Sequence, residues 1–201
     1  MAAGVSTGIR VNTTTKASCM VSSGLTFVGR YYKPSVAGSY EDRLQKPEAQ
    51  TISNAGMSIF SIYQYDARST ASFTSAQAHT DGATAVNQAV AAGQPTGTAI
   101  YFAVDYDATA SDLSNIIVPY FKIVKTYLDS YGYQLGVYGG YRTTITVGAA
   151  IPSIYRFQTD SWSNGQADPS RRLYQYTHNT AICSSTMDKV ESIGSFGGWK
   201  L

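Results

Sequence analysis

Two aspartates, Asp105 and Asp107, follow an unbroken apolar and aromatic run that begins at Ala99. Such a run, preceded by a Pro- and Gly-containing turn, predicts a strand buried on both faces. Side chains alternate along a strand, so both carboxylates should share one face, roughly 6–7 Å apart along the backbone. Buried carboxylates are costly unless they are paired or hydrogen-bonded. The pair therefore indicates a site with carboxylate acid–base chemistry. The alternative is structural, with Asp107 capping the next helix and Asp105 accepting backbone hydrogen bonds.

Composition narrows the possible partners. The chain has 201 residues, a net charge of +2, 14% charged residues and 16 tyrosines. This charge gives no reason to expect nucleic acid as a partner. No apolar segment approaches the roughly 20 residues of a membrane span. The chain has only two cysteines and two histidines, which lie far apart in sequence, so neither a metal site nor a cofactor is expected.

Turn residues and apolar patterns divide the chain into eight predicted strands and four clear helices. The strands are 8–12, 25–32, 57–65, 98–107, 134–138, 154–160, 172–176 and 185–190, and the helices 14–23, 46–56, 74–92 and 109–131. This alternation favours parallel βα units. We therefore expect an α/β fold: a small (β/α)8 TIM-type barrel, one domain over residues 1–201, with irregular or missing helices in its second half. An open doubly wound sheet is the rival, but no Gly-x-Gly-x-x-Gly loop follows the first strand.

The ends of the predicted strands form an ordered series. It includes Phe-Val-Gly-Arg-Tyr-Tyr from Phe27, Ile-Tyr-Phe-Ala-Val-Asp-Tyr-Asp from Ile100, Gly-Val-Tyr-Gly-Gly-Tyr from Gly136, Leu-Tyr-Gln-Tyr from Leu173, and Met-Asp at Met187. This series resembles the bacterial glycoside-hydrolase-like domain of unknown function that is related to family 25 lysozymes, over residues 8 to about 193. The resemblance implies a barrel whose pocket lies at the carboxyl ends of the strands.

The resemblance also implies catalytic roles. The fourth strand of those lysozymes ends in Asp-x-Glu, with the Glu as acid, and Asp105 and Asp107 occupy these positions. Asp107 is then the expected proton donor, which requires a raised pKa, Asp105 the stabilising carboxylate and Asp188 the third pocket carboxylate. The aspartate expected after strand one is replaced by Arg10, which cannot act as a base. We expect Arg10 to enter the pocket and pair with an acidic residue, with Asp188 the nearest candidate.

Further polar and aromatic residues near strand ends are candidates for substrate binding. Gln64 and Gln175 could bind sugar hydroxyls, and Asp160 either joins the pocket or lies in an exposed turn. His178 is a pocket wall or a solvated loop residue. Aromatic faces could stack on sugar rings or simply pack the barrel; these residues are Tyr32, Tyr65, Tyr138, Trp162 and Tyr176.

The expected function is hydrolysis of a polysaccharide such as peptidoglycan by a lysozyme-like pair of carboxyl groups. The alternative is a catalytically inactive carbohydrate- or cell-wall-binding barrel, favoured by Arg10 and by Asp107 in place of Glu. An unrelated structural role is a third possibility. Polysaccharide or cell-wall glycan is the expected partner, at an extracellular or cell-wall-associated location. The N-terminus nevertheless lacks the basic and apolar regions of a signal peptide.

Cys19 falls in the helix after strand one, and Cys183 between strands seven and eight. A closed barrel places strand eight beside strand one, so these two segments could meet. A disulfide would indicate an oxidising compartment. Two buried free thiols are the rival interpretation.

Overall fold

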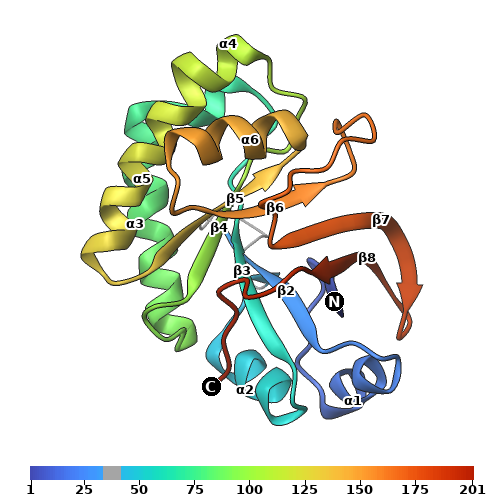
Figure 1. Ribbon diagram of the computed structural model, residues 1–201. Coiled ribbons are helices and arrows are strands. Elements are labelled where there is room, and N and C mark those ends of the chain that lie inside the picture. Colours follow the sequence, from blue (N-terminus) through green and yellow to red (C-terminus); the bar gives the residue numbers. More distant parts are fainter. Residues whose placement is uncertain (34–41) are drawn as a thin grey trace.

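The predicted eight-stranded barrel is confirmed by a computed structural model, which describes residues 1–33 and 42–201 and thus leaves out the predicted loop around Pro34 and Gly38. The strands close into a barrel in sequence order (Figure 1). They are β1 (Ala2–Ser6), β2 (Phe27–Tyr32), β3 (Ser58–Tyr63), β4 (Ala99–Ala103), β5 (Gln134–Gly139), β6 (Tyr155–Thr159), β7 (Leu173–Ile182) and β8 (Ser185–Ser192). Their carboxyl ends, β8 excepted, meet at one mouth.

Strand direction departs from the expected βα repeat at the end of the chain. Neighbours from β1 to β7 are parallel, but β8 is antiparallel to both β7 and β1. Only a two-residue turn, Cys183–Ser184, joins β7 to β8, and both residues have positive φ. That geometry suits a tight hairpin. Figure 1 shows this hairpin at the side of the barrel that α3, α5 and α2 do not cover.

The first strand was predicted wrongly. Residues 8–12 lie in the loop after β1, and the strand is the small-residue segment Ala2–Ser6. Alanine, glycine and serine have little intrinsic preference for strands. The segment is extended because it pairs with β2 on one side and β8 on the other.

Helices cover the outside of the barrel between most strands. They are α1 (Thr14–Ser22), α2 (Lys46–Asn54), η2 (Thr70–Phe73), α3 (Ser75–Ala92), α4 (Ala110–Asp112), η3 (Leu113–Ile117), α5 (Val118–Ser130) and α6 (Tyr141–Ala150). The predicted helix 109–131 is interrupted by η3, a π-helical segment just before Pro119. Thr74 caps α3 by accepting a hydrogen bond from Gln77 N, and Gly93 ends it in the left-handed conformation. Helix α6 was not predicted.

Aromatic rings fill the barrel interior because glycines on neighbouring strands leave room for them. Phe27, Phe60 and Tyr101 each lie over a glycine directly paired on the next strand. A Cβ atom at that glycine would come within 2.3–2.4 Å of the ring; the glycines are Gly4, Gly29 and Gly136. The rings pack edge to face, with centroids 5.9 Å apart for Phe27–Phe60 and 6.0 Å for Phe60–Tyr101.

The C-terminal tail lies across the amino-terminal end of the barrel. The Phe196 ring packs against Phe27, with centroids 4.9 Å apart, and the Phe196 carbonyl accepts a hydrogen bond from the Tyr101 hydroxyl. Trp199 exchanges backbone hydrogen bonds with Ile59. This end of the interior is therefore closed by the chain itself.

A buried ion pair joins β2 to α2 outside the barrel. Arg30 and Glu48 are both almost fully buried, and Arg30 Nε lies 2.6 Å from Glu48 Oε1. The remaining Arg30 donors reach the carbonyls of Thr7 and Asp42, and Glu48 also accepts a hydrogen bond from Val11 N. The pair thereby holds the loop after β1 against β2.

The disulfide interpretation of the cysteines is confirmed. Cys19 in α1 is bonded to Cys183 at the tip of the β7–β8 hairpin, with 5.9 Å between the Cα atoms. The bond joins residues 164 apart in sequence and ties the uncovered hairpin to the helix beside it.

We expect the Cys19→Ser/Cys183→Ser variant to lose about 2–4 kcal/mol of unfolding free energy, because its unfolded chain is no longer cross-linked. Urea unfolding of wild type with and without dithiothreitol should reproduce this loss, whereas dithiothreitol should not affect the double variant. Titration of two free thiols in denatured, unreduced wild type would contradict the bond.

Candidate functional site

A cavity of about 220 Å³ lies at the mouth of the barrel. Its wall comes from the carboxyl ends of parallel strands and from β8, whose reversed direction brings Asp188 beside Ser6, the last residue of β1. The lining residues are Tyr31, Ile62, Gln64, Asp105, Tyr138, Ser161, Trp162, Gln175, His178 and Asp188. The place is the one expected for the active site of a barrel enzyme.

Asp105 is the carboxylate beyond β4 that faces this cavity. Gln64 Nε2 donates a hydrogen bond of 3.1 Å to its Oδ2, and the exposed Arg68 Nε lies 3.9 Å from the same oxygen. Burial raises the pKa of Asp105, and the charge of Asp188 adds to that rise, while Gln64 and Arg68 act against it. The environment therefore favours a protonated Asp105 at a higher pH than for a solvated aspartate.

The second cavity carboxylate, Asp188, is held by donors. Gln175 Nε2 donates to Asp188 Oδ2 at 2.8 Å, and Asn179 N donates to Oδ1 at 2.9 Å. The Tyr138 hydroxyl in turn donates to Gln175 Oε1 at 2.7 Å, which orients the Gln175 amide. Burial raises the pKa of Tyr138, so its hydroxyl stays neutral and continues to donate.

His178 links the cavity to Asp160. Its Nε2 lies 2.5 Å from Asp160 Oδ1 and 3.2 Å from Ser161 Oγ, and its Nδ1 lies 4.0 Å from Asp188 Oδ1. Asp160 is not among the lining residues, so it reaches the site through His178. The β7–β8 register shifts on both sides of Thr177. Such a bulge changes the direction in which side chains point. Regular alternation from Gln175 would place Thr177 in the cavity, but His178 lines it instead.

Asp107 does not share the cavity with Asp105. The regular strand ends at Ala103, a bend follows at Tyr106, and strand alternation no longer applies. The Asp107 side chain is 57% exposed, and its Oδ1 lies 3.7 Å from Arg142 NH1. The structural alternative for Asp107 was also wrong, because Thr109 caps the next helix through a capping box with Asp112.

Arg10 lies in the loop after β1 and is not among the residues that line the cavity. Within residues 1–33 and 42–201 it forms no ion pair, and its buried Nε has no hydrogen-bond partner. The predicted pairing with Asp188 is therefore absent from the described part of the chain.

Among the predicted aromatic candidates, Tyr138 and Trp162 line the cavity, whereas Tyr32, Tyr65 and Tyr176 do not. Tyr32 is fully buried and donates to Gln94 Oε1, while Tyr65 and Tyr176 are exposed. Alternation along β2 places Tyr31 in the cavity instead, a residue the sequence analysis missed together with Ile62 and Ser161. Counting outward from the glycine that accommodates Phe60 would have identified Tyr31.

Trp162 is held in an unusual backbone conformation, with φ of 56°. Positive φ is uncommon for a bulky side chain and tends to mark functional positions. Gly140, just after β5, permits the close approach, since a Cβ there would lie 3.1 Å from Trp162 Cβ. The Ser163 hydroxyl accepts from Tyr141 N at 2.9 Å and fixes the turn. Gly140 thus allows Trp162 to approach β5 and to line the cavity.

Comparison with known proteins shows the family. The model of the Rv2525c-like, glycoside hydrolase-like domain matches residues 18–192. The chain belongs to this family. An uncharacterized relative, FadG of Bacillus subtilis strain 168, is 33% identical over 129 residues, which are 63% of this chain and 22% of FadG. The chain thus spans about a fifth of that curated relative.

Solved structures share the fold of this Rv2525c-like domain. The Tat-secreted protein Rv2525c of Mycobacterium tuberculosis, in complex with L-tartrate, superposes with a TM-score of 0.84 at 24% identity over 98% of both chains. The modular autolysin LytC of Streptococcus pneumoniae, with a synthetic peptidoglycan ligand, gives 0.62 at 10% identity over 94% of this chain and 46% of LytC. At these identities the likeness concerns the fold alone.

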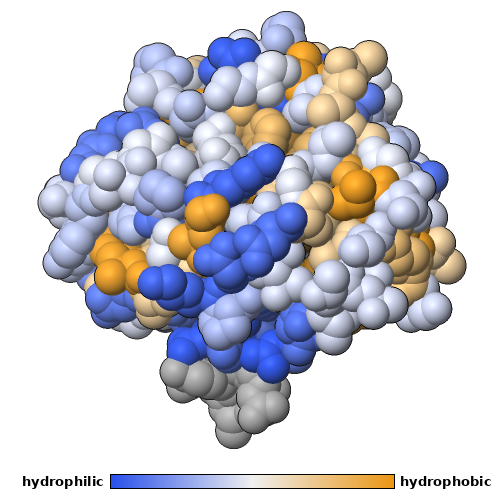
Figure 2. Space-filling model, turned by 90° about the horizontal axis from the view of Figure 1, so that it is seen from below, coloured by the Kyte–Doolittle hydropathy of each residue, from blue (hydrophilic) through white to orange (hydrophobic). Residues whose placement is uncertain are grey.

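No cluster of three or more His, Cys, Asp or Glu residues in the described part of the chain is arranged to hold a metal ion. Likewise, none of its helices is both long and apolar enough for a membrane crossing. On the face shown in Figure 2, hydrophobic residues lie in small patches among hydrophilic ones.

Proposed function

We propose that this domain hydrolyses a glycan such as peptidoglycan, with Asp105 as the proton donor to the leaving-group oxygen. The observation that carries the proposal is the position of Asp105 in the cavity at the barrel mouth, where burial raises its pKa. A general acid needs its proton at the working pH, and a raised pKa supplies it.

Asp188 is the second carboxyl group in this proposal. It faces the same cavity as Asp105 and accepts hydrogen bonds from Gln175 and Asn179, which complement a negatively charged oxygen. Glycoside hydrolysis uses two carboxyl groups with different roles, one acid and one nucleophile or base. The different surroundings of Asp105 and Asp188 support that division.

The rest of the cavity wall suits a sugar. Tyr31, Tyr138 and Trp162 offer aromatic faces, and Gln64 offers an amide that already contacts Asp105. Aromatic rings supply apolar contact area, and amides and hydroxyls supply hydrogen bonds. In this proposal, residues 1–201 form a single glycoside-hydrolase-like domain whose reaction needs no cofactor.

Three observations support a cell-wall substrate met outside the cytosol. LytC, which shares the fold, binds a synthetic peptidoglycan ligand. Export fits both the disulfide, a bond typical of oxidising compartments, and the Tat-secreted relative Rv2525c.

A second candidate, glycan binding without turnover, is favoured by Asp107. The resemblance to family 25 lysozymes implies that the residue at this position is the proton donor. The Asp107 side chain, however, is exposed and paired with Arg142. Incubation with purified cell walls separates the two candidates. Release of new reducing ends supports hydrolysis, whereas co-sedimentation with the walls without release supports binding.

The pH dependence of hydrolysis should reflect the protonation state of Asp105. A proton donor is active while protonated, so kcat/KM should fall as pH rises through its pKa, which burial places above the ordinary aspartate value of about 3.9. Arg68→Gln removes a charge that favours the ionised form, so the descending limb should move to higher pH. Arg142→Gln, beside exposed Asp107, is the matched control and should leave the limb in place. An unshifted limb in Arg68→Gln would contradict this assignment.

A further inference from the structure

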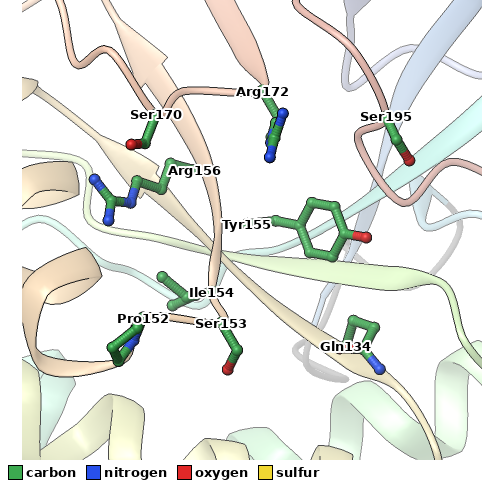
Figure 3. Close-up of a pocket in the computed structure, with 9 residues that line it drawn as sticks. All are labelled: Gln134, Pro152, Ser153, Ile154, Tyr155, Arg156, Ser170, Arg172 and Ser195. Carbon is green, nitrogen blue, oxygen red and sulfur yellow. The ribbon is translucent and has the colours of Figure 1, made fainter.

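A second cavity, of about 460 Å³, lies at the opposite end of the barrel. Its wall is formed by the first residues of β5 and β6, the segments before β6 and β7, and the C-terminal tail at Ser195. Figure 3 shows Arg172 and Tyr155 extending into the space between these segments. No residue that the site at the barrel mouth uses belongs to it.

The charge of this second cavity is unbalanced. Two arginines, Arg156 and Arg172, line it, and no acidic residue is among its lining residues. Arg156 NH1 lies 3.2 Å from Oδ1 of the fully buried Asp168, so this charge is compensated. The exposed Arg172 has no ion pair or side-chain hydrogen bond anywhere in residues 1–33 and 42–201.

Arg156 and the backbone of Arg172 are held in place before any ligand arrives. Arg156 packs over Gly148 of α6, where a Cβ would come 2.2 Å from Arg156 Nε. The Arg172 backbone is fixed on both sides, because its N donates to the Arg156 carbonyl and its carbonyl accepts from Ile193 N. A fixed backbone means that only the Arg172 side chain must be ordered on binding, which limits the entropy lost.

Hydroxyl and amide groups surround the uncompensated arginine. The Tyr155 hydroxyl has no hydrogen-bond partner among the described residues, and in Figure 3 it lies between the side chains of Ser195 and Gln134. Ser153, Ser195 and the Gln134 amide complete the polar wall. A guanidinium binds oxyanions through paired N–H donors, and the neighbouring groups could bind hydroxyls.

We infer that this second cavity binds an oxyanion, phosphate or carboxylate, carried on a small hydroxylated molecule. Arg172 contacts the anionic group, and Tyr155, Ser195 and Gln134 contact the hydroxyls. The volume lies within the usual range for small-molecule sites, about 300–1,000 Å³. The inference is independent of the proposed glycan hydrolysis, because the two cavities share no residue.

The test is a titration of ¹⁵N-labelled protein at constant ionic strength with inorganic phosphate, glycerol phosphate and glycerate. We expect saturable shifts at residues 153–156, 170–172 and 195, with a Kd on the order of 1 mM for the better ligand. Arg172→Gln should weaken binding on the order of tenfold. The matched control Arg68→Gln, an exposed arginine at the opposite end of the barrel, should bind as wild type does.

Comparison of the three ligands distinguishes the possible outcomes. Tighter binding of glycerol phosphate than of inorganic phosphate supports the hydroxyl contacts, and comparison with glycerate identifies the preferred oxyanion. Unchanged binding in Arg172→Gln, or non-saturable shifts spread over all basic residues, would overturn the inference. Release of reducing ends from cell walls should be the same in Arg172→Gln and wild type, so failure of one proposal leaves the other intact.

Discussion

Asp105→Asn is expected to lower glycan hydrolysis by about 10²–10⁴-fold, the usual contribution of a general acid. Asparagine keeps the shape of the side chain and an oxygen that can accept from Gln64, but it carries no transferable proton. The fold should therefore survive. Release of reducing ends from purified cell walls measures the loss, and circular dichroism checks the structure.

Asp107→Asn is the matched control for this experiment. Its side chain is exposed and lies outside the cavity at the barrel mouth, so activity should stay close to that of wild type. Loss of activity in Asp107→Asn with retention in Asp105→Asn would return the acid role to the position that the lysozyme resemblance assigns. Wild-type protein that binds cell walls but releases no reducing ends would favour the glycan-binding candidate.

Glu48→Leu is expected to destabilise the domain by about 3–5 kcal/mol, because it leaves the fully buried Arg30 guanidinium without its counter-charge. Val11 N loses its acceptor in the same variant. The midpoint of urea unfolding measures the loss.

The double variant Arg30→Met/Glu48→Leu is the control for the buried charge. It removes both charges, and apolar replacements of a buried pair are often tolerated. We expect it to be more stable than Glu48→Leu alone, although Thr7 and Asp42 lose a donor to their carbonyls. A double variant less stable than Glu48→Leu would show that the backbone contacts of Arg30 dominate the effect.

Strongly patterned elements could be predicted from sequence. The apolar runs of β2 to β5 and the capped helix α3 were located to within a few residues, because periodicity, caps and turn glycines agree there. The position of β8 was also predicted, but its antiparallel direction was not. Helix α6 was missed for another reason. Tyr141–Ala150 is rich in threonine, a poor helix former, so packing rather than propensity makes it a helix.

Strand alternation predicted part of the candidate site, where the alternation continues at the carboxyl end of the strand. Asp105, Gln64, Tyr138 and Gln175 obey it and were placed at the barrel mouth. Asp107 lies beyond the bend at Tyr106, where strand alternation has ended and the chain leads into the helix capped by Thr109. Arg10 was placed at the end of a strand that lies elsewhere, since β1 depends on partners distant in sequence.

The Cys19–Cys183 bond has a consequence for the chain after cleavage by a protease. It encloses strands β2 to β7 within one covalent ring and leaves β1 and β8 in the two tails. A single cut anywhere between the two cysteines therefore opens the ring without releasing a fragment. The two pieces of the nicked protein would stay joined by the disulfide until it is reduced. One piece would carry β1 and the other β8, and these strands are also paired with each other.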